Sequence, residues 1–181
     1  MEKVTKLKIK YPIGKEPNVC NPEKYTDYRF VLGRKGKNPL VAICMNPSRA
    51  ADDVSDRTVN RVISASEFLG YDGWFVVNVY PERATDANNM DCFDKTLNAE
   101  NIKYILELLE LQSIKEVWSA WGDLKHDNLK IAVQELKTCL QNKGIKFFGF
   151  DKLTKAGNPR HPLYLKIDKE KKQYYHFIQY V

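Results

Sequence analysis

The sequence has 181 residues, 43% of them hydrophobic, and a formal net charge of +6. This length and apolar content suit one domain with its own core. No stretch approaches the roughly 18 consecutive apolar residues of a membrane span, and no apolar signal core follows the charges near the amino end. We therefore expect a cytoplasmic protein that does not enter a membrane. The positive charge suits a polyanionic partner, although lysine runs such as those near the two ends are also typical of solvated faces.

The four cysteines, Cys20, Cys44, Cys92 and Cys139, lack the paired short spacings of a zinc site. Cys44 and Cys139 fall inside apolar periodic segments, so we interpret the cysteines as buried thiols and not as a disulfide framework or as nucleophiles. A glycine-rich phosphate loop and a dinucleotide fingerprint are also absent from the sequence. We expect neither a metal nor a cofactor.

Proline and glycine punctuate residues 1–26, which we expect to form an irregular arm with at most a short strand at residues 4–9. Residues 27–181 are expected to form a single α/β domain. Its first strands are predicted at residues 28–32 and 40–45, and the second is a continuous apolar run of the kind buried on both faces of a parallel sheet. A helix is predicted at residues 55–69, between a Ser55 or Asp56 cap and Gly70.

Strands and helices alternate along the rest of the chain. Strands are predicted at residues 74–79, 114–121 and 145–150, and helices at residues 98–111 and 129–140. Residues 174–181 are predicted either to add an edge strand or to lie over the sheet. This alternation requires right-handed crossovers, so the expected fold is a three-layer α/β/α domain with a mostly parallel central sheet of about four core strands.

Polar side chains gather after several of the predicted strands, and their common place is the main functional signal. Any one of these clusters alone would pass as an ordinary turn, because Asn, Pro, Gly and Ser are common in such loops. Ligands of parallel sheets bind beyond the carboxyl ends of the strands, so we expect the clusters to converge on a small-ligand or nucleotide site. The candidate residues are Asn46, Pro47, Ser48, Asn78, Tyr80, Arg83, Asp86, Trp121, Gly122, Asp123, Asn158, Arg160 and His161.

Two asparagines at strand ends have roles that the sequence leaves open. Asn46 precedes Pro47, which fixes the backbone, so its carboxamide is suited to orient a water or a base edge; an ordinary turn asparagine is the equal alternative. Asn78 interrupts an apolar run, where an unpaired buried amide would cost roughly 1 to 3 kcal/mol. Neighbouring backbone would satisfy this amide, and so would the donors and acceptors of a nucleobase.

The loop after the last predicted strand carries the preferred histidine. His161 stands between Arg160 and Pro162, where it is suited to donate a hydrogen bond to developing negative charge or to transfer a proton. Arg160 is suited to contact a phosphate. A histidine that only fixes its own loop is the alternative. Arg83 and Asp86 either belong to the site or simply pair with each other.

These motifs together resemble a bacterial and phage family of unknown function, DUF1643, over residues 28–165. The resemblance rests on Met45-Asn46-Pro47-Ser48, Asp56-Arg57-Thr58, Val77-Asn78-Val79-Tyr80 with Arg83-Ala84-Thr85-Asp86, Ala120-Trp121-Gly122, and the run from Gly157 to Tyr164. Their order is similar to that of the uracil-DNA glycosylase superfamily, which implies a glycosylase-like fold. In that superfamily an Asp or Asn before Pro positions the hydrolytic water, and a strand-ending Asn recognises the base. A Trp-Gly closes a later strand, and a His-Pro loop stabilises the base anion.

Applied to this chain, the resemblance implies an N-glycosidic bond hydrolase that acts on DNA or a nucleotide. Asn46 would orient the water, Asn78 would hold the base, and His161 would stabilise the departing base anion. Tyr80 or Trp121 would stack on the base.

A non-catalytic binder of a nucleotide or modified base is the alternative, with Arg83 and Arg160 on phosphates. In either case the expected partner is a nucleobase, a nucleotide or a nucleic acid. The sequence leaves the oligomeric state open.

Overall fold

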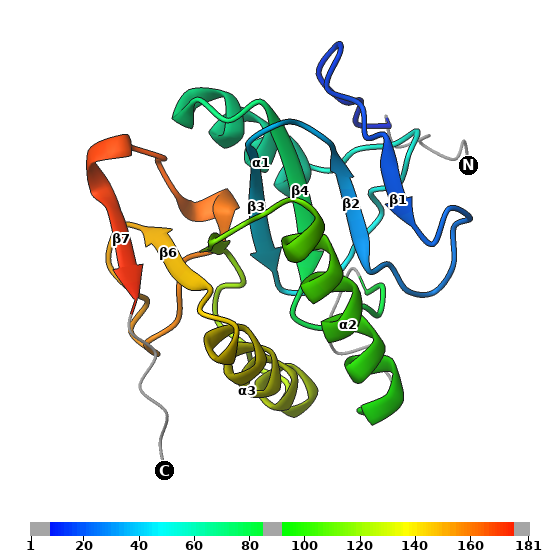
Figure 1. Ribbon diagram of the computed structural model, residues 1–181, viewed down its shortest axis with the longest axis vertical. Coiled ribbons are helices and arrows are strands. Elements are labelled where there is room, and N and C mark those ends of the chain that lie inside the picture. Colours follow the sequence, from blue (N-terminus) through cyan, green and yellow to red (C-terminus); the bar gives the residue numbers. More distant parts are fainter. Residues whose placement is uncertain (1–7, 85–91, 176–181) are drawn as a thin grey trace, which may run out of the picture.

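The computed structural model describes residues 8–84 and 92–175, and in this part of the chain one sheet is covered by three α-helices (Figure 1). Its seven strands lie in the order β1-β2-β4-β3-β5-β6-β7. The strands are β1 (Val19–Asn21), β2 (Val31–Arg34), β3 (Pro39–Cys44), β4 (Gly73–Asn78), β5 (Glu116–Ser119), β6 (Lys146–Phe150) and β7 (Lys172–Tyr175). The helices are α1 (Arg57–Leu69), α2 (Lys95–Leu111) and α3 (Asp127–Asn142), with the 3-10 turns η2 (Pro162–Tyr164) and η3 (Lys169–Lys171).

Strand direction makes the sheet mixed. The pairs β3–β4, β3–β5 and β5–β6 are parallel. The pairs β1–β2, β2–β4 and β6–β7 are antiparallel. The prediction of a mostly parallel sheet is therefore wrong for the sheet as a whole. The antiparallel strands β1, β2 and β7 lie toward the edges of the sheet and are short. They therefore lack the continuous apolar runs that mark the buried strands in the sequence.

Local sequence signals explain where the helices begin. Asp56 caps α1 by accepting a hydrogen bond from Val59 N at 2.8 Å, and Gly70 follows its last turn. Asp94 caps α2 through Thr96 N and Leu97 N, so this helix begins before residue 98, where the apolar repeat first becomes visible. The three predicted helices are all present, and none of the described helices is long and apolar enough to cross a membrane.

The core lies on both faces of the sheet. β3 and β4 are buried along their whole length, with alternate side chains on opposite faces. Leu40, Trp74 and Trp118 pack with the buried side of α1, whereas Val41 and Phe75 pack with α2 and α3. The helices therefore form a layer on each face (Figure 1).

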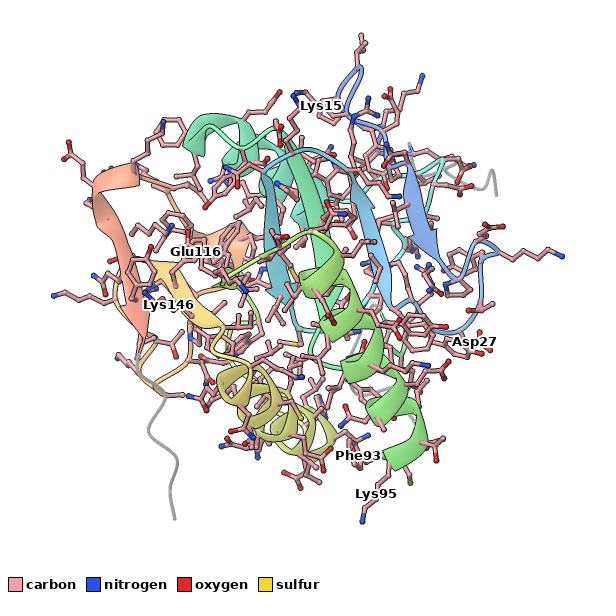
Figure 2. The ribbon with its side chains drawn as sticks, viewed as in Figure 1. Lys15, Asp27, Phe93, Lys95, Glu116 and Lys146 are labelled. Carbon is pink, nitrogen blue, oxygen red and sulfur yellow. The ribbon has the colours of Figure 1, made fainter. Side chains whose placement is uncertain are left out.

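Residues 8–16 contain no strand but pack firmly against the domain. Tyr11 is only 8% exposed and stacks on Trp74 with ring centroids 6.0 Å apart. The Trp74 indole donates to Lys15 O at 3.1 Å, and Ser55 N donates to Ile9 O at 2.9 Å. Lys15 marks this arm in Figure 2, near the blue amino-terminal ribbon. Of the short strand considered at residues 4–9, residues 4–7 lie outside the described part of the chain.

Candidate functional site

A cavity of about 670 Å³ opens beyond the carboxyl ends of β3, β5 and β6. This volume is within the range of small-ligand pockets. Two aromatic rings, three cationic side chains and one carboxylate line it together with a histidine. The lining residues are Met45, Trp121, Gly122, Asp123, Lys125, Thr154, Lys155, Arg160, His161 and Tyr164. The cavity therefore brings together the predicted Trp121-Gly122 and Arg160-His161 motifs.

His161 lines the cavity, and one nitrogen of its ring is fixed by the backbone. It caps η2, and its Nδ1 accepts a hydrogen bond from Leu163 N at 3.4 Å. Burial lowers the pKa of His161 below its ordinary value, and the carboxylate of Asp56 partly opposes that change. A neutral imidazole that accepts at Nδ1 carries its proton on Nε2. The Nε2–H group is thus the donor that this ring can offer to a ligand.

Gly122 allows the β5 loop to approach His161 closely. Its φ of +72° lies in the left-handed region. A Cβ atom at this position would stand 3.0 Å from the Cβ of His161. Both the backbone conformation and the contact therefore favour glycine next to the histidine.

The far wall of the cavity is fixed by a carboxylate. Asp123 accepts hydrogen bonds from the Thr154 hydroxyl and from Asn158 Nδ2, the second at 3.1 Å. Arg160 donates through Nε to Lys152 O at 2.8 Å and lies 3.8 Å from the Asp151 carboxylate. Asn158 thus braces the loop rather than lining the cavity. Arg160 has its Nε committed to the backbone, and its terminal nitrogens remain as donors for a ligand.

Asn46 joins two loops at the carboxyl edge of the sheet. Its Nδ2 donates to Pro47 O at 3.1 Å and to Ala84 O at 2.8 Å, and Ala84 N donates to Pro47 O at 3.0 Å. These bonds fix the amide plane; Met45, the preceding residue, lines the cavity, whereas Asn46 itself does not. Among the described residues no donor reaches Asn46 Oδ1, so this oxygen is an oriented acceptor.

Asn78 is buried in contact with Arg29 and does not line the cavity. Its side chain is 1% exposed, and its Oδ1 accepts a hydrogen bond from Arg29 Nη2 at 3.3 Å. The backbone carbonyl of Asn78 accepts from Asn101 Nδ2 at 2.9 Å. The acceptor of this amide is thus satisfied by the Arg29 side chain and not by neighbouring backbone, and its Nδ2 has no partner among the described residues.

Arg83 and Arg29 both donate hydrogen bonds to the β3–α1 loop. Its Nη1 donates to Ser48 O at 2.8 Å and to Ala50 O at 3.0 Å. Its guanidinium lies 4.1 Å from the centre of the Tyr25 ring. The predicted Ser48 therefore contributes a carbonyl that positions Arg83, and Asp86, its possible ion-pair partner, lies outside the described residues.

Tyr80 belongs to the core rather than to the cavity wall. Its ring is 1% exposed and packs against Phe93 with centroids 5.6 Å apart, and its hydroxyl accepts a hydrogen bond from Asp94 N at 3.0 Å. Trp121 and Tyr164 are the aromatic residues that line the cavity.

A comparison with models of protein families shows to which family the chain belongs. Residues 29–163 match a family described as "Protein of unknown function (DUF1643)". This chain belongs to the DUF1643 family. The resemblance of the motifs to DUF1643 is thus confirmed. Comparisons with curated proteins and with solved structures gave no match.

The DUF1643 region includes two residues near the site that were not among the candidate site residues, Arg29 and Asp56, although Asp56 belongs to one of the motifs. Arg29 interrupts the apolar residues that lead into β2, and this was the available signal. Asp56 is the α1 cap, but it also acts electrostatically on Arg29 and His161. It is therefore near enough to affect the pKa of both groups. Capping alone gave no reason to expect that second role.

None of the four cysteines is among the residues that line the His161 cavity. The four cysteines are free; Cys44 is buried, Cys20 and Cys139 are half-buried, and Cys92 is exposed. The interpretation as buried thiols is therefore confirmed for Cys44, holds only in part for Cys20 and Cys139, and is wrong for Cys92, which lies just before α2 in a loop where the apolar pattern is interrupted. Burial raises the pKa of the Cys44 thiol to about 12. Within the described residues, no group of His, Cys, Asp and Glu side chains is arranged to hold a metal ion.

Proposed function

We propose that this protein recognises a nucleobase or nucleotide in the His161 cavity. One observation carries the proposal: a histidine whose Nδ1 already accepts a backbone hydrogen bond lines the same cavity as Trp121 and Tyr164, which leaves Nε2–H as the group its ring can donate. A flat heterocycle suits such rings, and its acceptors suit that donor. Lys125, Lys155 and Arg160 supply positive charge for a phosphate.

We further propose that the parallel strands β4, β3, β5 and β6 correspond to the core of the uracil-DNA glycosylase superfamily. The order of the motifs supports this proposal. The Asn46-Pro47 motif follows β3, Asn78 ends β4, Trp121-Gly122 follows β5, and His161-Pro162 follows β6.

The chemistry that fits this arrangement is hydrolysis of an N-glycosidic bond. Asn46 Oδ1 is an oriented acceptor able to hold a water molecule. The water oxygen would form a bond to C1′ of the sugar while the bond from C1′ to the base nitrogen breaks. The electron pair leaves with the base, whose negative charge is stabilised by His161 Nε2–H, and the proton lost by the water ends on the released base. Such a preorganised donor commonly contributes about 100-fold to 1,000-fold in rate.

Binding without turnover is the second candidate, and the position of Asn78 favours it. The amide that would recognise the base is buried and engaged by Arg29. A ligand in the cavity would then be held by rings and cations without the base contact that glycosidic chemistry uses.

The test uses the whole protein with nucleosides, nucleoside monophosphates, and uracil-containing or mismatched oligonucleotides. Chromatography measures released base, and calorimetry measures binding. If the protein is a hydrolase, base is released, and His161→Gln slows release about 100-fold or more while binding persists. His126→Gln, at the α3 cap, is the matched control and should retain full activity.

Binding without release, weakened by Lys125→Gln with Lys155→Gln, would select the second candidate. If no compound is bound or cleaved, both candidates are wrong.

A further inference from the structure

A pair of arginines lies side by side beyond β4, outside the His161 cavity. The segments that carry them pair through the backbone: Arg29 N donates to Pro81 O at 2.8 Å, and Arg83 N donates to Asp27 O at 2.7 Å. Both side chains then donate to the same carbonyl, Ala50 O, at 2.8 Å and 3.0 Å. Two guanidinium groups therefore meet at one point of the β3–α1 loop.

These guanidinium groups are not matched by ion pairs in the described part of the chain. Arg29 is 1% exposed, and in residues 8–84 and 92–175 neither arginine forms an ion pair with a carboxylate. Burial and the positive charge of Arg83 lower the pKa of Arg29 to about 10, and Asp56 acts in the opposite direction. Buried charges in proteins are ordinarily paired.

The unused polar atoms of this cluster are all hydrogen-bond donors. The buried Nε atoms of Arg29 and Arg83 and the buried Nδ2 of Asn78 have no partner among the described residues. Each of these residues is tied to another member of the cluster through Ala50 O or Asn78 Oδ1. Donors without acceptors, next to two positive charges, fit a ligand that offers several acceptor oxygens and negative charge.

We propose that Arg29, Arg83 and Asn78 form an oxyanion site whose ligand is a phosphate group. Arg29 forms its closed end, and Arg83, which is only half-buried beneath the exposed Tyr25 ring, forms the end near the surface. None of these residues lines the His161 cavity. The site therefore does not depend on the function proposed for that cavity.

The test is calorimetric titration of the whole protein with inorganic phosphate at constant ionic strength, with chloride as the reference anion. Saturable binding of one phosphate per chain is expected, and the melting temperature should rise with the logarithm of the phosphate concentration above the dissociation constant. Arg83→Gln should weaken phosphate binding at least about tenfold, because a charged bidentate donor is lost. Arg49→Gln is the control, because it removes an exposed arginine from the β3–α1 loop. This variant should bind phosphate as the wild type does.

A second arm replaces inorganic phosphate with ribose 5-phosphate, to distinguish a free anion from a phosphomonoester. Tighter binding of either compound, lost in Arg83→Gln, identifies the source and supports the site. Two results would overturn the proposal. One is the absence of saturable phosphate binding by the wild type. The other is equal phosphate binding by Arg83→Gln and the wild type, which would mean that the arginines only stabilise the β3–α1 loop.

Discussion

Replacing Gly122 by alanine should disturb His161 more than it disturbs the fold. The left-handed φ of +72° penalises any Cβ by about 1 to 2 kcal/mol. The added methyl would also meet the His161 Cβ at 3.0 Å, so the histidine must shift by a few tenths of an ångström. Overpacking of this kind adds about 1 kcal/mol. We therefore expect a loss of about 2 to 3 kcal/mol in the free energy of unfolding, measured by urea denaturation.

Gly144→Ala is the matched control for this change. Gly144 has nearly the same φ, +71°, but nothing lies within 4 Å of the position of its Cβ. It should therefore lose only the backbone part, about 1 to 2 kcal/mol. Histidine NMR spectra separate the two effects: the His161 ring signals should shift in Gly122→Ala and stay in place in Gly144→Ala. Equal losses of stability with unchanged His161 signals in both variants would refute the close contact.

Two further predictions concern pH. Because burial lowers the pKa of folded His161, the unfolded chain binds more protons, and stability should fall as pH drops below about 6.5. His161→Gln should remove that part of the slope in denaturation series between about pH 5 and pH 8, and an unchanged slope would contradict it. For Glu116, burial raises the pKa, but hydrogen bonds from Lys172 and Tyr174 outweigh it, and the net pKa is lowered. Its contribution is thus present at neutral pH and lost below about pH 4.3; Glu116→Gln should cost about 1 kcal/mol at neutral pH and nothing in acid.

The sequence predicted the centre of the fold better than its edges. β3 and β4 are continuous apolar runs buried on both faces, and the apolar repeats of the helices are bounded by polar caps. Edge strands have no such signature. β1 has three residues, all half-buried, and β7 pairs with β6 from a stretch rich in lysine. Pairing partners far away in the sequence, and not local periodicity, make these segments strands.

The candidate site was predicted as one cluster but occupies two places. Trp121 and His161 line the cavity, whereas Asn78 and Arg83 lie with Arg29. Trp121, His161 and Arg83 follow parallel strands, Asn78 ends one, and Arg29 precedes the antiparallel β2, so all of them lie at the same edge of the sheet. Side-chain direction at a strand end depends on the last peptide and on the partners it meets, and a single sequence does not fix these. The motifs therefore predicted at which edge of the sheet the site residues lie, but not which side chains contact one another.

The docking of residues 8–16 has a consequence for the order of folding. Tyr11, Lys10 and Lys15 reach partners that lie 40, 50 and 59 positions later in the chain: Ala51, Asn60 and Trp74. A segment that binds only to residues synthesised later cannot settle when it leaves the ribosome, and contacts across such separations form slowly. Residues 8–16 should therefore be among the last segments to reach their native packing, after β3, α1 and β4 have packed. Because Tyr11 and Ile9 bind the β3–α1 loop at Ala51 and Ser55, that late step would also complete the support behind Asp56.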